Sequence, residues 1–260
     1  MIERIKAVLI QEYYISYRSI EVWMDNIFFP VMTALVFGLI AKYLSGENAL
    51  AADYLILGMS FWFVIQIAQY SISLGALWNV WSRNLSNMFI SPLSLTEYMI
   101  AQIISSLLKS IVIFGAISLM YYFVFNFNIL KIGYINFILH LINLLIFSWV
   151  IGMILLGVIF KYGTRIQALA WGSIFLFQPL AAVFFPVSVL PPVIQQISLL
   201  IPITYVFEGA RNNLINPVIN WQNIGMAFFL NIIYAIISTF IFKYLFNKSK
   251  ETGQFARNEG

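Results

Sequence analysis

The sequence predicts an all-α integral membrane protein with six transmembrane helices. We expect an N-terminal interfacial helix before them, a short cytoplasmic helix among them and two short outer re-entrant helices before the last span. Of the 260 residues, 62% are hydrophobic and 9% are charged, whereas a soluble domain is about 45–50% apolar and about 25% charged. Apolar stretches of about 20 residues, the length that crosses a bilayer, recur along the chain. Prolines interrupt one further apolar stretch near the end.

Residues 1–22 predict an amphipathic helix lying on the membrane surface. Apolar residues recur there at helical spacing, with charged residues between them: Ile2, Ile5, Val8 or Leu9, and Tyr13. A polar leader without fixed structure is the alternative interpretation. The charges leave no apolar core of the length that a secretory signal needs, so no such signal is expected.

The membrane domain is predicted over residues 23–247. Its six spans run at about 26–44, 53–78, 98–125, 134–160, 164–185 and 221–246. Pro30 predicts a kink in the first span, and Asp25 and Asn26 just before it are interpreted as helix caps. Residues 248–260 predict a cytoplasmic tail that is disordered from Ser249 onwards.

The distribution of Lys and Arg predicts that both termini are cytoplasmic. With that orientation ten basic residues lie inside: Arg4, Lys6, Arg18, Arg83, Lys161, Arg165, Lys243, Lys248, Lys250 and Arg257. Three lie outside: Lys42, Lys131 and Arg211. An excess of basic residues on the cytoplasmic side is the usual rule for membrane proteins. The apolar segment that the prolines interrupt then lies on the outer side.

Missing motifs argue against several function classes. The chain has no GxxxxGK[ST] loop, so we expect ATP to bind elsewhere. It also lacks HExxH and GxSxG motifs, and it has one His and no Cys, which leaves no basis for a multi-His or thiolate metal site. We therefore predict no catalytic residue, no metal site and no cofactor bound by this chain. Its dispersed basic residues do not predict nucleic-acid binding.

The segment between the second and third spans predicts a short amphipathic helix at about 82–93 on the cytoplasmic side. Pro92 blocks its continuation. Ser94 or Thr96 can cap the next helix, and Glu97 falls in the first turn of that helix. A short helix between rigid turns is suited to docking into a partner's groove.

The outer segment at about 186–217 is apolar but broken by Pro186, Pro191, Pro192 and Pro202. The unbroken pieces, 193–201 and 203–215, are too short to cross the hydrocarbon. Backbone that breaks at membrane depth is tolerated inside protein or beside a water-filled cavity. The pattern therefore indicates a lined cavity or gate, which favours transport.

Several polar residues have two interpretations each. Lys109 in the third span is a cavity cation for an anionic headgroup, or a snorkelling or paired lysine. Glu208 and Arg211, three apart on one helix face, form a partly buried clamp or a solvated pair. His140 is interpreted as a packing residue rather than a proton relay. Gln66 and Gln69 in the second span are, with Lys109, the pathway candidates, because polar groups in spans avoid lipid.

These features resemble the type-2 ABC exporter permeases, the ABC-2 family. The most specific match is FPVSVLPPVIQQISLLIPITYVFEGARNNL at 185–214, which contains the family's Pro-x-Thr-Tyr-x-x-Glu-x-x-Arg pattern. The Ile-Ser-Pro-Leu-Ser run at 90–94 resembles the inner-loop signature. Drug-efflux members often carry acidic residues before that run, whereas this chain has Arg83 and Asn84.

The resemblance implies a permease subunit that exports an amphipathic, drug-like or lipid-linked substrate across the cell membrane. It implies two cytoplasmic ABC ATPase subunits, which hold ATP and Mg²⁺, and a second permease copy, preferably identical. The resemblance implies that the ATPase contacts Arg83, Leu85, Met88, Phe89, Ser91, Pro92 and Leu93. It implies an outer gate formed by Pro191, Pro202, Tyr205, Glu208 and Arg211.

Other functions stay open. A permease for polysaccharide or lipid-linked glycan is the first alternative, and a membrane scaffold that transports nothing is the second. A secondary transporter would show repeats and charged coupling sites at mid-membrane. A membrane enzyme would show more ionisable residues within its spans.

Overall fold

The computed structural model describes residues 1–82 and 84–251, with no account of the side chains of residues 85, 86 and 89. Among these residues there are helices and turns but no strands. The principal helices are α1 (Ile2–Arg18), α2 (Ile20–Trp23), α3 (Phe29–Leu44), α4 (Ala49–Trp81), α5 (Leu85–Ile90), α6 (Leu95–Phe125), α7 (Tyr134–Tyr162), α8 (Gln167–Gly172), α9 (Phe177–Leu180), α10 (Pro192–Ser198), α11 (Pro202–Ile215) and α12 (Trp221–Glu251). Short π or 3₁₀ turns are η1 (Met24–Phe28), η2 (Ile129–Ile132), η3 (Gly163–Ile166), η4 (Ser173–Leu176) and η5 (Val187–Val189).

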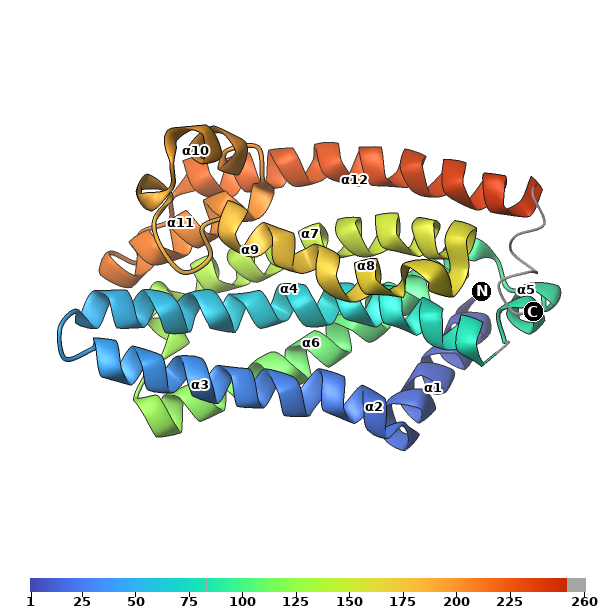
Figure 1. Ribbon diagram of the computed structural model, residues 1–260, viewed down its shortest axis with the longest axis horizontal. Coiled ribbons are helices and arrows are strands. Elements are labelled where there is room, and N and C mark those ends of the chain that lie inside the picture. The colour runs from blue at the N-terminus through green and yellow to red at the C-terminus, as the bar shows by residue number, and fades with distance from the viewer. Residues whose placement is uncertain (83, 252–260) are drawn as a thin grey trace.

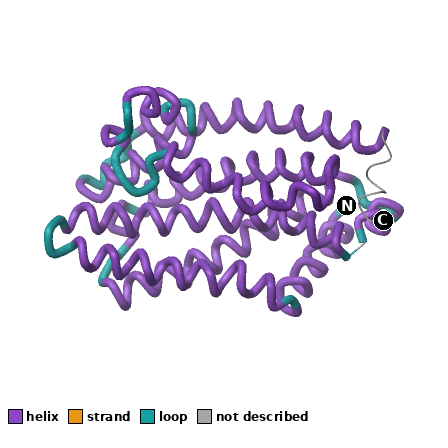
Figure 2. Tube along the Cα trace, viewed as in Figure 1, coloured by secondary structure: helices purple, strands orange, loops and turns teal. Residues whose placement is uncertain are grey.

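The long helices lie side by side in one bundle, and the short elements gather at its two ends (Figure 1). The start of α1, the helix α5 and the end of α12 lie at one end, whereas α10 and α11 lie at the other. Figure 2 shows that the loops also collect at these ends. The predicted topology places the same segments on opposite sides of the membrane.

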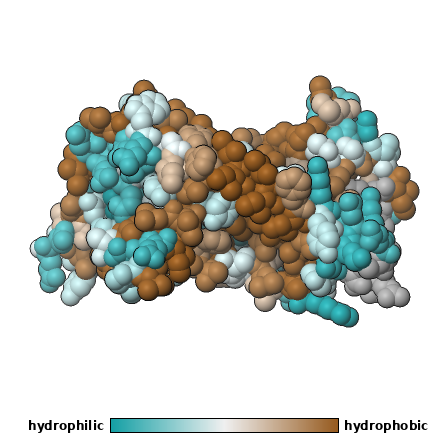
Figure 3. Space-filling model, turned by 90° about the horizontal axis from the view of Figure 1, so that it is seen from above, coloured by the Kyte–Doolittle hydropathy of each residue, from teal (hydrophilic) through white to brown (hydrophobic). Residues whose placement is uncertain are grey.

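Five helical stretches are long and apolar enough to span a membrane, or six if the bent pair α10–α11 counts as one span. They are Ile20–Leu44, Ala49–Trp81, Leu95–Phe125, Tyr134–Leu180 and Trp221–Glu251. The face in Figure 3 has an apolar band across its middle and hydrophilic side chains toward both ends. This distribution is that of a multi-pass membrane protein.

Helix α4 forms the centre of the bundle. It packs against α3, α6, α7 and α8, and almost all its residues from Ile56 to Val80 are buried. Because α4 is apolar on every side, it has no polar face to turn outward, and such a helix is stable only when neighbours surround it. Its polar side chains therefore meet other helices rather than lipid.

The stretch from α7 to α9 turns back on itself. The ring centroids of Phe147 and Phe177 lie 5.1 Å apart, although a straight helix would separate these positions by about 45 Å. The reversal occurs at Gly163. Its φ of 65° is a positive value that glycine adopts readily because it has no Cβ atom. The segment predicted as a fifth span at 164–185 is thus a row of short helical turns that ends at Leu180, and an irregular loop follows.

Three predicted boundaries are wrong near the chain ends. The helix predicted over 1–22 ends at Arg18, where Ser19 has an extended backbone and accepts a hydrogen bond from the Val22 amide. The first span therefore starts at Ile20, and Asp25 and Asn26 lie inside the π-helical turn η1 instead of capping a helix. Helix α12 continues to Glu251, so the tail expected at 248–260 is helical over its first four residues. Residues 252–260 lie outside the described part.

Candidate functional site

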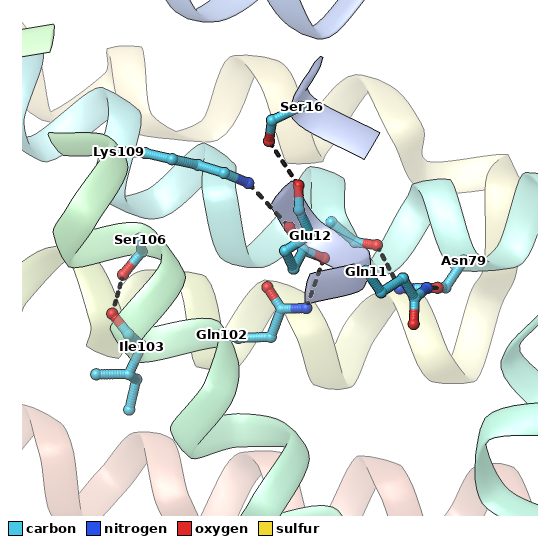
Figure 4. A network of polar contacts seen from close by, with 9 residues as sticks. Gln11, Glu12, Ser16, Asn79, Gln102, Ile103, Ser106 and Lys109 are labelled. Carbon is cyan, nitrogen blue, oxygen red and sulfur yellow. Dashed lines mark hydrogen bonds and ion pairs between the residues drawn. The ribbon is translucent and has the colours of Figure 1, made fainter. Parts of the chain in front are cut away.

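A buried polar cluster joins α1 to α6 (Figure 4). Glu12 of α1 is 3% exposed. One carboxylate oxygen lies 2.9 Å from the Lys109 ammonium, and the other accepts a hydrogen bond of 3.0 Å from the Gln102 amide. Beside it, Gln11 donates to Asn79 of α4 at 2.8 Å. The N-terminal helix is therefore fastened to both α4 and α6 by polar side chains.

The sequence of α1 explains this position. Glu12 lies four residues after Val8 and seven after Ile5, so the carboxylate shares the apolar face of the helix. On α6, Gln102 and Lys109 are seven residues apart and face the same side. The side chain of Lys109 is only 20% exposed and is paired with Glu12, and its role on a substrate route stays a prediction.

A second pathway candidate, Gln69, is a helix contact as well. Gln69 is fully buried and donates to Ser73 Oγ at 2.7 Å and to the Ala170 carbonyl at 3.2 Å. It thereby links α4 to the irregular α8 segment. Gln66, one turn earlier on α4, is partly exposed. Whether these side chains line a route for a substrate stays a prediction.

The predicted pair Glu208–Arg211 is present in α11 and holds the irregular loop beside it. Arg211 is 3% exposed at its side chain and lies 2.8 Å from Glu208. It also donates to the Ala182 and Val183 carbonyls at 2.9 and 3.3 Å. Glu208 accepts from the Val187 amide at 2.7 Å. Because Ala182 has a φ of 51°, these bonds secure a left-handed turn that a non-glycine residue rarely adopts.

The loop is pressed onto the central helix. A Cβ atom at Gly58 of α4 would lie 2.3 Å from the Val183 carbonyl oxygen, so no larger residue fits there without a shift. Ser198 of α10 donates to the Leu180 carbonyl on the other side of the loop. The Glu208–Arg211 pair, predicted as a partly buried clamp on one helix face, thus also joins α11 to loop 181–187.

The proline breaks fall where they are expected. Pro191 precedes α10, and Pro202 begins α11, with a bend of 99° between these helices. The Tyr205 hydroxyl donates to the Leu199 carbonyl at 3.0 Å, across the bend. Three of the five predicted gate residues, Tyr205, Glu208 and Arg211, therefore make contacts that fix this segment.

A row of polar side chains on α7 forms hydrogen bonds with α11, with the loop after α11 and with α12. His140 Nε2 lies 2.9 Å from Asn213 Oδ1 of α11, which fits the packing interpretation of this histidine. Asn136 donates to the Pro217 carbonyl at 3.0 Å. Asn231 of α12 donates to Asn143 Oδ1 at 3.0 Å. Helices α7, α11 and α12 consequently form one tightly connected group.

The predicted ATPase-contact segment contains the short helix α5, followed by a proline turn. Met88 is buried, Ser91 donates to its carbonyl, and Leu93 packs against the core. Ser94 and Glu97 form the capping box that starts α6. Arg83 lies outside the described residues, as do the side chains of Leu85 and Phe89.

Sequence reasoning missed two residues of α1. Arg4 donates to the Pro92 carbonyl and lies 3.2 Å from Glu97. Together with Glu12, it attaches both halves of α1 to α6. A signal for Glu12 was present, because a lone carboxylate on an otherwise apolar helix face needs a buried partner. Arg4 offers no comparable signal.

Among the described residues, no three His, Asp or Glu side chains gather as a metal ion would need.

A family model described as ABC-2 type transporter matches residues 3–215. The matched range runs from the first turn of α1 to the last residue of α11. It therefore includes the α1–α6 cluster, the α5 turn and the bent pair with its clamp. No curated protein matches the chain.

Proposed function

Since the chain belongs to the ABC-2 type transporter family, we propose that it is the permease subunit of an ATP-driven exporter that a separate ATPase subunit energises. The family match over residues 3–215 carries this proposal. Domains of this family are transmembrane components rather than catalytic ones. The complex would hold two ATPase subunits and two copies of this chain in the cell membrane, with both termini cytoplasmic.

The position of α5 supports the contact with an ATPase. This helix projects at the end of the bundle where α1 starts and α12 ends (Figure 1). Its last residue, Ile90, is 83% exposed, and the Pro92 turn behind it is tied to Arg4 of α1. A push on α5 would therefore reach α6 directly and α1 through Arg4. Such a mechanical connection is what an ATPase needs to re-tilt the membrane helices and export an amphipathic substrate.

Ile90→Asp tests the docking site. We expect the full-length variant to fold normally, because the side chain is exposed, and to bind the ATPase about tenfold more weakly, since a charge replaces an apolar anchor. The measurement is co-purification of the tagged permease with the P-loop ATPase encoded nearest to its gene, together with ATPase activity in proteoliposomes.

Ile215→Asp is the matched control. Ile215 is 64% exposed at the end of α11, toward the opposite end of the bundle. This variant should retain wild-type ATPase binding. Equal binding by both variants would place the contact elsewhere. An assembled complex whose ATPase activity responds to no amphiphile would favour the scaffold interpretation.

A further inference from the structure

The junction between α1 and the first span borders two adjoining cavities. One is a small cavity of about 20 Å³ between α1, η1, α4 and α6. The other is a groove of about 400 Å³ between α1, α2, η1 and α6. Val22, Asn26 and Lys109 line both. The groove therefore adjoins the small cavity at these three side chains.

The small cavity has the chemistry of a cation site. Two carboxylates, Glu12 and Asp25, and one ammonium, Lys109, line it, which gives a formal net charge of −1. Tyr70 and Trp78 also line it, and aromatic rings attract cations to their faces. The charge balance disfavours an anionic headgroup, because Glu12 already neutralises Lys109.

Two groups at the small cavity lack a partner. Ser71 is 6% exposed, and its buried hydroxyl has no hydrogen-bond partner. None of the described residues forms an ion pair or hydrogen bond with the Asp25 carboxylate, which the π-helical turn η1 places on the cavity wall. An unpaired carboxylate within a membrane span is expensive, and π-helical turns are frequent at functional sites. A hydrogen-bond donor with a positive charge would satisfy both groups.

The volumes restrict the shape of that donor. A cavity of about 20 Å³ holds one water molecule, so it accepts a primary ammonium but not a trimethylated one. The groove is lined mainly by apolar side chains, among them Leu9, Trp23, Ile27, Leu108 and Val112. Its volume falls within the usual range for small-molecule sites. It suits an alkyl or aromatic tail.

We propose that this site binds an amphiphile with a primary ammonium head, with the head between Glu12, Asp25 and Ser71 and the tail in the groove. Binding requires this chain alone. That such amphiphiles are exported rests on the proposed function.

The experiment measures binding of radiolabelled dodecylamine to the full chain in phosphatidylcholine nanodiscs, with empty nanodiscs subtracted. Wild-type protein should bind saturably, whereas dodecyltrimethylammonium and dodecyl sulfate should compete poorly. Asp25→Asn should weaken binding about tenfold, because a charge-assisted hydrogen bond is lost. Ser71→Ala should weaken it less. The control is Asp53→Asn. Asp53 lies on α4 about 27 Å from Ser71, so this variant should bind as wild type does.

Three results would overturn the site: no saturable binding, equal competition by the trimethylated amine, or an Asp25→Asn affinity equal to that of Asp53→Asn. Export of dodecylamine from proteoliposomes with the ATPase is measured separately. Binding of dodecylamine without ATP-dependent export of it or of any other amphiphile would refute the proposed function while the site stands. Export of other amphiphiles without dodecylamine binding would refute the site alone.

Discussion

Replacing Glu12 with alanine is expected to lower the free energy of unfolding by about 3 kcal/mol. The change leaves the Lys109 ammonium inside the bundle without its counter-charge and removes the acceptor of Gln102. Breaking one side of a buried ion pair is strongly destabilising because the other charge stays desolvated. The measurement is unfolding of the purified full chain in detergent, followed by tryptophan fluorescence.

Two further variants isolate the pair from its surroundings. Removing both charges with Glu12→Gln and Lys109→Met should restore most of the lost stability, since no unpaired charge remains. Glu3→Ala is the matched control on α1, because the Glu3–Lys6 pair is exposed and such pairs contribute little. A double variant as unstable as Glu12→Ala, or a Glu12→Ala as stable as Glu3→Ala, would contradict the prediction.

Exchanging Glu208 and Arg211 is expected to destabilise the protein by about 4 kcal/mol. A simple ion pair, as the sequence predicts, would tolerate this exchange. In the structure the Arg211 guanidinium donates to two loop carbonyls, and Glu208 accepts from the Val187 amide. After the exchange a carboxylate faces the carbonyls and a guanidinium faces the amide, so both positions become repulsive.

Thermal unfolding and limited proteolysis at loop 181–187 report this effect, because the loop should open when its clamp fails. Arg211→Lys serves as the graded control. A lysine keeps the charge but lacks the planar fork that reaches several acceptors, so an intermediate loss is expected. An exchanged variant with wild-type stability and a protected loop would show that the charge pair alone matters.

The sequence was sufficient for features that depend on local chemistry. Pro202 starts α11, because the first turn of a helix does not use the amide donor that proline lacks, and the bend between α10 and α11 lies just before it. Ser94 and Glu97 form the expected capping box. Helix ends were less predictable, since a helix can extend past its apolar stretch when a neighbour accepts its polar residues. Ser249 of α12, which donates to the Phe160 carbonyl, is such a case.

The candidate site was only half predictable for a different reason. Lys109, Glu208 and Arg211 were recognisable as charges in apolar surroundings. The partners that lie far away in the sequence were not recognisable. Glu12 is 97 residues from Lys109, and Ala182 is 29 residues from Arg211. Such pairings depend on how each helix is rotated about its axis. Apolar periodicity cannot fix that rotation in helices as evenly hydrophobic as α4.

The polar row on α7 has a consequence for how the protein is made. Asn143 meets Asn231 only after another 88 residues are translated, which takes about 4 to 18 s at typical elongation rates. During that interval the amide would face lipid or a partly built bundle. Asn136 and Asn143 each donate to the carbonyl four residues earlier, which belongs to Ile132 of η2 and to Leu139 of α7. The newly inserted helix thus carries its own temporary acceptors until α11 and α12 arrive.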